Sequence, residues 1–171
     1  MQHKVILRAP EDADVDRIFM WENDRNMWES SPTCAPVSRL QVWQYIQNYD
    51  ADPLRAGELR LIAVDSENRL PAGHVDLFEI DSHSRRAGVA VYVDPSKRRQ
   101  GYGLAILTAI ADYARMQLDL HQLWAHIAVD NSMSLALFKA AGYRPAGRLR
   151  SWLLRDARWV DVLIWQLLFP H

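Results

Sequence analysis

The chain has little of several features that mark common classes of protein. It has one cysteine in 171 residues, Cys34, which excludes an internal disulfide and a multi-cysteine zinc site. Its formal net charge is −1, so it lacks the basic field on which nucleic-acid binders depend. No window approaches about 18 uninterrupted apolar residues, and residues 1–8 become polar too early for a signal peptide. These absences predict a cytoplasmic protein without a membrane or nucleic-acid partner.

The composition is that of an ordinary globular protein. Hydrophobic residues make up 49% and charged residues 24% of the chain. A chain of 171 residues can bury one sizeable core. Because no internal repeat and no long linker interrupts the sequence, we expect a single domain over residues 1–171.

The most informative stretch covers residues 89–105. It consists of a β-branched strand, a Pro-Ser turn, the basic triplet 97–99, two glycines at 101 and 103, and the start of a helix. Glycine lets a backbone turn tightly and approach a ligand closely. The first turn of a helix has unpaired N–H groups and a partial positive charge. A strand that leads through glycines into a helix therefore predicts a cradle for an anion, most often a phosphate.

Two common phosphate-binding patterns do not fit this stretch. The Walker pattern needs a lysine directly after its second glycine, and Leu104 stands there. The Rossmann pattern needs a third glycine, and Ile106 stands at that position. The pattern that remains is Arg98-x-x-Gly101-x-Gly103.

Hydrophobic periodicity and turn residues predict the secondary structure. The expected strands cover residues 3–8, 58–65, 69–80, 85–93, 122–129, 145–154 and 159–168. The first expected helix starts near residues 10–14 and runs to about residue 24. The other expected helices cover 38–49, 101–118 and 132–141, and Asp52 and Pro53 close the second helix. The order β-α-α-β-β-β-α-β-α-β-β predicts an α/β (α+β) fold, with a mixed central sheet of about seven strands and helices on both faces. Trp124, Trp152 and Trp165 lie on expected strands, and we expect them in the core.

In its spacing, Arg98-x-x-Gly101-x-Gly103 resembles the acetyl-CoA signature of the GCN5-related N-acetyltransferases (GNAT superfamily). Residues 129–143 resemble the family's second signature, and the element order is that of the GNAT fold. The matching positions in the second signature are Asn131, Ser134, Leu137, Phe138, Gly142 and Tyr143. Residues 7–12 and 85–87 are similar to one branch, which holds the spermidine/spermine and the ribosomal-protein N-terminal acetyltransferases.

The resemblance implies that acetyl-CoA is the co-substrate and that a deprotonated amine attacks its thioester directly, without a metal. Holding both substrates in line supplies on the order of 7–11 kcal/mol of the barrier reduction where the geometry is ideal. Backbone groups of the central strand would pair with the pantetheine arm, and the glycine loop would hold the pyrophosphate. The cofactor-binding residues implied are Val91, Tyr92, Val93, Arg98, Arg99, Gln100, Gly101, Tyr102, Gly103, Leu104, Asn131, Ser134 and Phe138.

The acceptor is expected to be a small-molecule amine. Residues 73–80 are similar to those of the polyamine members, which carry carboxylates there to hold a cationic substrate. We assign Asp76 to substrate binding and Glu79 to the catalytic base, because residues three apart in a strand point to opposite faces and at most one can serve as the base. The sequence is equally consistent with Asp76 and Glu79 being solvent-facing strand residues that have no catalytic role. The resemblance also implies that Trp28 and Glu29 lie in the acceptor pocket, where aromatic and acidic groups attract a cation.

Two residues depart from the family pattern. Many members use a tyrosine where this chain has Phe138, and phenylalanine cannot protonate the leaving thiolate. Tyr92, Ser134 or a water could supply that proton, or CoA could leave unassisted. Polyamine members tend to have a glutamate where this chain has Gly88.

Three functions therefore remain open. The first is acetylation of a spermidine- or spermine-like polyamine, and the second is acetylation of a protein N-terminus. The third, favoured by Phe138 and Gly88, is a non-catalytic module that binds acyl-CoA. The resemblance also implies a homodimer formed through the C-terminal strands.

Overall fold

The computed structural model describes residues 4–24 and 35–170, so Trp28, Glu29 and Cys34 lie outside the described residues. These residues form two compact units. One unit comprises residues up to Arg8 together with those from Asp52 onward, and the other comprises Ala9–Ala51. The expectation of a single domain stays a prediction.

The Ala9–Ala51 unit contains a short 3-10 helix, η1 (Asp12–Asp14), and the helices α1 (Val15–Glu22) and α3 (Arg39–Gln47). Ser38 caps α3, because its hydroxyl accepts a hydrogen bond from the N–H of Gln41 at 3.1 Å. The Gln41 side chain in turn accepts from the N–H of Ser38 at 2.8 Å. This reciprocal cap confirms the helix start that the sequence predicts.

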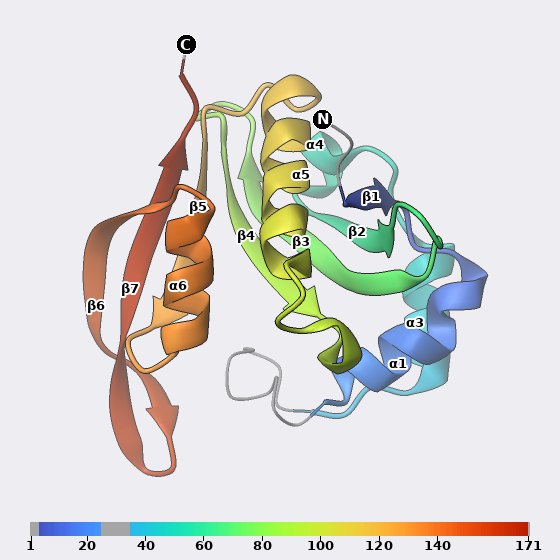
Figure 1. Cartoon of the computed structure of the whole chain (residues 1–171), viewed down its shortest axis with the longest axis horizontal. Helices are drawn as coiled ribbons and strands as arrows, with labels where there is room; N and C mark the ends of the chain where they lie inside the picture. The colour runs from blue at the N-terminus through green and yellow to red at the C-terminus, as the bar shows by residue number, and fades with distance from the viewer. Residues whose placement is uncertain (1–3, 25–34, 171) are drawn as a thin grey trace. The chain divides into compact units, whose positions relative to one another are not determined.

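The larger unit is built on one sheet of seven strands (Figure 1). The strands are β1 (Val5–Arg8), β2 (Leu59–Asp65), β3 (Pro71–Asp81), β4 (Arg86–Val93), β5 (Gln122–Ala128), β6 (Arg144–Arg155) and β7 (Arg158–Leu168). Their order in space is β1-β2-β3-β4-β5-β7-β6. β4 and β5 pair in parallel, and the other neighbouring pairs are antiparallel. The prediction of a mixed seven-strand sheet is confirmed.

The same unit holds η2 (Pro95–Lys97), α4 (Pro53–Ala56), α5 (Tyr102–Met116) and α6 (Ser132–Ala140). The sequence analysis treats Asp52 and Pro53 as the end of a helix, whereas they begin α4. The Asp52 carboxylate accepts hydrogen bonds from the N–H groups of Leu54 and Arg55, and Pro53 occupies the first turn. A capping carboxylate followed by proline starts a helix as readily as it stops the preceding one.

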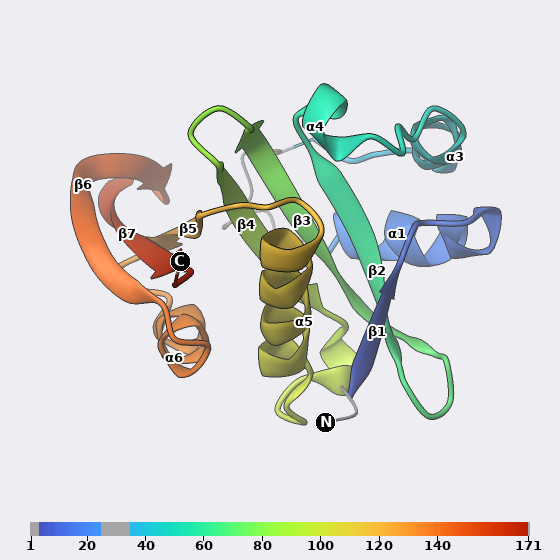
Figure 2. The same cartoon turned by 90° about the horizontal axis from the view of Figure 1, so that it is seen from above.

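Helix α5 lies across one face of the sheet (Figure 2). Its residues Ile106, Leu107, Ile110 and Ala114 are fully buried. Paired residues of neighbouring strands point to the same side of a sheet, and successive residues of one strand alternate between sides. Val93 of β4 points toward α5, because a Cβ on Gly103 would lie 3.6 Å from its Cγ2. Gly88, an odd number of residues from Val93, therefore lies on the side away from α5, which we call the far face, together with residues that pair in register across four strands. These are Arg60 with Asp76, Phe78 with Gly88, and Gly88 with Trp124.

A buried hydrogen bond fixes the start of α5. The Tyr102 hydroxyl donates to the carboxylate of Asp65, which also accepts from the N–H groups of Glu67 and Asn68 at 2.9 and 3.0 Å. The bond from Tyr102, followed by those from Asn68 and Glu67, lowers the pKa of Asp65 to about 2. The same bond raises the pKa of Tyr102 to about 12. One carboxylate thus holds both the turn after β2 and the first turn of α5.

Tyr102→Phe removes this bond, and we expect a less stable protein near neutral pH. Because the pKa of Asp65 is lowered by folding, the stability linked to its charge is complete above its ordinary pKa of 3.8 and is lost as the pH falls toward about 2. The melting temperature of the wild type should therefore fall more steeply below about pH 4 than that of the variant. Thermal melts recorded by circular dichroism test this, with Tyr113→Phe on the same helix as the matched control. Equal acid slopes for wild type and Tyr102→Phe would contradict the prediction.

Candidate active site

The two central strands, β4 and β5, diverge after a short paired segment. β4 and β5, both fully described, pair only from Arg86 with Gln122 to Gly88 with Trp124. Beyond this point β4 continues to pair with β3 as far as Val93 with Gly73. Figure 1 shows β5 diverging from β4. The edge of β4 from Val89 to Val93 that faces β5 therefore keeps backbone N–H and C=O groups to offer to an extended ligand.

The loop after β4 leads these strand groups into the start of α5. Asp94 caps η2 by accepting from the N–H of Ser96 at 2.9 Å. Arg98 donates from Nε to the carbonyl of Val93 at 3.1 Å, which anchors its guanidinium at the end of β4. Arg99, with φ +59°, and Gly101, with φ +83°, both adopt left-handed conformations. Glycine adopts this conformation without strain, so Gly101 is where the tight turn into the helix falls.

The N-terminus of α5 is shaped to receive a ligand. Its N-cap residue is Gly101, so no side chain caps the first N–H groups. A Cβ at Gly101 would meet nothing within 4 Å, whereas one at Gly103 would lie 3.0 Å from Cδ2 of Leu137 on α6. Gly101 thus leaves space above the helix end, and Gly103 allows close packing against α6. The N-terminus of α5 therefore fits a pyrophosphate, because unpaired N–H groups and the helix dipole both favour an anion.

The predicted cofactor-binding residues fall into three groups around this opening. Val91 and Val93 lie on the diverging edge of β4, and Arg98 to Leu104 form the loop and first helical turn. Tyr102 can offer only its backbone, because its side chain is buried against Asp65. Asn131 caps α6 by accepting from the N–H of Ser134 at 3.1 Å. Their contacts with acetyl-CoA stay predictions.

Phe138, at the family's usual proton-donor position, and Tyr92, one of the alternative donors, are both buried. Phe138 is 5% exposed, and its ring meets Tyr143 edge to face at 4.9 Å. Burial raises the pKa of Tyr143 well above its usual range. Tyr92 is 2% exposed and stacks on His74 at 5.3 Å. Tyr92 as a proton donor stays a prediction, and its buried ring means that a proton would have to travel through neighbouring groups.

Asp76, the predicted substrate ligand, already holds a cation of the protein itself. Arg60 donates to it from Nε at 2.6 Å and from a terminal nitrogen at 2.7 Å. Nδ1 of His74 lies 3.6 Å from the same carboxylate. Burial opposes the charge of Asp76, but Arg60 and His74 outweigh it and hold its pKa well below the usual range. The sequence analysis did not anticipate this pairing, which joins residues 16 positions apart through the register of β2 and β3.

Glu79 does not follow the alternation of its strand. The pairing of β3 with β4 is irregular between Phe78 and Asp81, and Glu79 has φ +50°. The argument that Asp76 and Glu79 point to opposite faces requires regular alternation, and that regularity ends at Phe78. Glu79 as the catalytic base stays a prediction.

Phe78 accounts for the glycine at position 88. A Cβ on Gly88 would lie 2.3 Å from Cε2 of the Phe78 ring, which also meets Trp124 edge to face at 5.1 Å. The ring therefore occupies the space that a longer side chain at position 88 would need. Phe78 was missed in the sequence because only the β3–β4 register brings it to Gly88.

Gly88→Ala should destabilise the protein by about 1–3 kcal/mol, because the added methyl group forces the Phe78 ring from its place. Combining it with Phe78→Ala should recover part of the loss, since the smaller side chain leaves room. Urea denaturation of the two single variants and the double variant measures this coupling. Additive losses in the double variant would mean that the two side chains do not compete for space.

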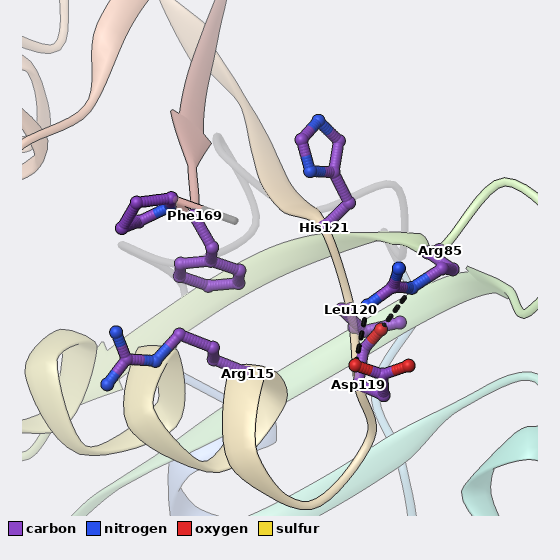
Figure 3. Close-up of a pocket in the computed structure, with 7 residues that line it drawn as sticks. Arg85, Arg115, Asp119, Leu120, His121 and Phe169 are labelled. Carbon is purple, nitrogen blue, oxygen red and sulfur yellow. Dashed lines mark hydrogen bonds and ion pairs between the residues drawn. The ribbon is translucent and has the colours of Figure 1, made fainter.

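A separate pocket of about 240 Å³ lies at the other end of α5 (Figure 3). It is lined by Arg85, Arg115, Asp119, Leu120, His121, Phe169 and Pro170. The Arg85 side chain is already engaged, donating to the carbonyl of Asp119 at 2.6 Å. With 15 residues in α5, about 20 Å of helix separates this pocket from Gly101. It therefore does not belong to the glycine cradle.

Comparison with known proteins decides the family. Residues 4–144 match the family model of the acetyltransferase (GNAT) domain. The chain belongs to this family. It is therefore an acyltransferase of the N-acetyltransferase class, with acetyl-CoA as the acetyl donor, and the resemblance inferred from the two signatures is confirmed.

Two relatives and one solved structure show how this GNAT chain compares in detail. It is 25% identical over 166 residues to spermidine N(1)-acetyltransferase of Vibrio cholerae, covering 95% of this chain and 91% of the relative. It is 32% identical over 147 residues to L-methionine sulfoximine/L-methionine sulfone acetyltransferase of Pseudomonas aeruginosa, covering 85% and 80%. The crystal structure of the Vibrio cholerae spermidine enzyme with CoA and spermine superposes with a TM-score of 0.84 at 24% identity, covering 98% and 96% of the two chains. This superposition shows that the folds are the same.

The described residues contain neither a metal-binding cluster nor a membrane-spanning helix. No group of histidine, cysteine, aspartate and glutamate side chains among residues 4–24 and 35–170 is arranged to hold a metal ion. In the same ranges, no helix is long and apolar enough to cross a membrane.

Proposed function

We propose that this GNAT enzyme acetylates a primary amine of a small polyamine such as spermidine or spermine. The observation that carries the proposal is the similarity to a spermidine acetyltransferase over 95% of the chain, at 25% identity. The fold it shares with an enzyme crystallised with CoA and spermine supports the same reading.

In this proposal the chain's own groups hold the donor. The first N–H groups of α5, from Gly101 onward, bind the pyrophosphate, and Arg98 and Arg99 add charge beside it. Backbone groups of Val91 to Val93 pair with the pantetheine arm along the free edge of β4. When bound, acetyl-CoA supplies the acetyl group as a reactive thioester. The strand edge then fixes the direction from which an amine reaches the carbonyl.

A second acceptor class is favoured by a specific observation. The carboxylate of Asp76, predicted to hold a cationic substrate, is neutralised by Arg60. An amino acid analogue such as methionine sulfone has a single amine and needs fewer anionic groups than a polyamine. The 32% identity to a methionine sulfone acetyltransferase supports this alternative.

Acceptor preference separates the candidates. Thiol release from acetyl-CoA is measured with spermidine, spermine, putrescine, methionine sulfone and a peptide with an N-terminal serine. We expect the highest kcat/KM with spermidine or spermine. A higher kcat/KM with methionine sulfone would select the second candidate, and a preference for the peptide would indicate acetylation of protein N-termini.

The homodimer through the C-terminal strands also stays a proposal. Trp152, Leu154 and Trp159 on the β6–β7 hairpin are 55%, 61% and 64% exposed, although the sequence predicts Trp152 in the core. That prediction was wrong because β6 is the edge strand of the sheet and turns this side chain to solvent. Exposed apolar side chains of this kind are suited to cover one another in a second copy. Sedimentation equilibrium of wild type and Trp159→Ser tests this, and a monomeric wild type would contradict it.

A further inference from the structure

The far face holds a titratable residue that neither GNAT signature includes. His126 lies on β5 two residues beyond Trp124, where the pairing with β4 ends. Side chains alternate along a strand, so His126 and Trp124 share the far face. Their rings are 4.7 Å apart, and the Trp152 ring lies 6.5 Å from the imidazole. The imidazole therefore stands beside the opening between the diverging strands.

The surroundings of His126 favour its neutral form. Partial desolvation lowers the pKa of His126, although the residue stays exposed to solvent, and the negative charge of Glu79 opposes this only in part. Within the described part of the chain, Glu79 on β3 is the charged group that acts on His126. Trp124 on β5 and Trp152 on β6 carry no group that titrates near neutral pH. A neutral imidazole can accept a proton under physiological conditions.

Glu79 lies in the irregular last part of β3, between Phe78 and Asp81. Its φ of +50° is a left-handed conformation that non-glycine residues seldom adopt. Strained backbone of this kind persists where the surrounding structure enforces it, and it is common at functional sites. The Glu79 side chain is exposed, so its carboxylate can attract an ammonium group and can also stabilise a protonated His126.

We propose that His126 is the general base of this enzyme and that Glu79 is a positioning residue that stabilises the protonated imidazole. The proposal rests on the acetylation of a primary amine. His126 takes one proton from the acceptor's ammonium group, which frees the nitrogen lone pair. That lone pair forms a C–N bond to the acetyl carbonyl carbon while the C–S bond breaks. A second proton from the nitrogen ends on the CoA sulfur, and the proton on His126 is released to solvent.

Kinetics of matched variants test the proposal. His126→Gln should lower kcat by about 10²-fold at neutral pH, because it removes a general base. Its acetyl-CoA affinity by calorimetry should be unchanged. His83→Gln, in the exposed turn before β4, is the control and should retain wild-type kcat. In wild type, kcat/KM should rise with pH through the pKa of His126, and His126→Gln should lack this step. In Glu79→Gln the step should move to lower pH, since the attraction that favours the imidazolium is gone.

A second readout does not depend on turnover. In the free enzyme, the NMR signal of the His126 imidazole should titrate at a lower pH than that of an ordinary histidine, and at a still lower pH in Glu79→Gln. The proposal would be overturned if His126→Gln kept the wild-type kcat and the same rise of kcat/KM with pH. It would also be overturned if the pKa of His126 were the same in wild type and Glu79→Gln. If the wild type acetylated no amine, the proposed function would fail, whereas the NMR titration would still report on His126 and Glu79.

Discussion

Gly101→Val should weaken acetyl-CoA binding by about 10²–10⁴-fold. The valine side chain would fill the space above the first turn of α5, where a Cβ now meets nothing within 4 Å. It would also resist the left-handed φ of +83°. Losing two charge-assisted hydrogen bonds costs about 3–6 kcal/mol at roughly 1.5–3 kcal/mol each, which corresponds to that loss of affinity. Isothermal titration calorimetry with acetyl-CoA measures it directly.

Gly57 provides the matched control for this experiment. It has φ +75°, its Cβ position is equally open, and it ends α4 rather than beginning α5. Gly57→Val therefore imposes similar backbone strain without touching the glycine cradle. We expect both variants to lose thermal stability and only Gly101→Val to lose acetyl-CoA binding. Equal affinities in the two variants would show that the start of α5 does not hold the donor.

Arg60→Met should destabilise the protein by about 3–5 kcal/mol at neutral pH. The change leaves the Asp76 carboxylate, 22% exposed, without its bidentate partner. A carboxylate that loses its guanidinium partner in this position costs more than the ion pair itself contributes, because its desolvation is then compensated only by His74. Chemical denaturation of the variant measures the loss.

Two controls show whether the loss of stability in Arg60→Met comes from the Asp76 carboxylate that has lost its partner. Arg60→Met/Asp76→Leu removes both charges and should recover most of the stability. Arg39→Met breaks a pair with the same 2.6 Å separation, Arg39 with Asp16, whose side chains are 60% and 76% exposed. That change should cost less than about 1 kcal/mol. A similar loss from Arg39→Met and Arg60→Met would contradict the role assigned to burial.

The pH dependence of the Arg60→Met deficit has a definite sign. In wild type the pKa of Asp76 is lowered, so the stability linked to its charge is present above the ordinary carboxyl pKa and is lost as the pH falls through the folded value. Without Arg60, only His74 opposes the effect of burial, so the pKa of Asp76 rises and the carboxyl group takes up a proton more readily. The gap between variant and wild type should therefore shrink as the pH falls below about 4. A gap that widens in acid would contradict this account.

Local signals in the sequence predicted the fold well. Each feature that was predicted correctly depends on residues within a few positions of one another. These features are the Ser38 cap, the seven strands, the turn at Gly101 and Gly103, and the Asn131 cap. Such signals fail where one pattern has two meanings, as at Asp52 and Pro53, which both end and begin helices. Trp152 was misplaced because an aromatic residue on a strand looks the same in an edge strand as in a central one.

The chemistry of the far face was less accessible from the sequence. The pairing of Arg60 with Asp76 and the contact of Phe78 with Gly88 depend on strand register, which joins residues far apart in the chain. The irregularity at Glu79 breaks the alternation that any sequence-based argument assumes. His126 has no metal-like spacing and matches no signature. Its interest comes only from its position beside the diverging strands.

The most direct test of the account is the release of CoA thiol from acetyl-CoA in the presence of spermidine, with acetylated spermidine identified by mass spectrometry. We expect thiol and acetylspermidine to form in equal amounts with the wild type, and neither to form above background with Gly101→Val. No acetylated spermidine from a wild-type protein that binds acetyl-CoA would contradict polyamine acetylation.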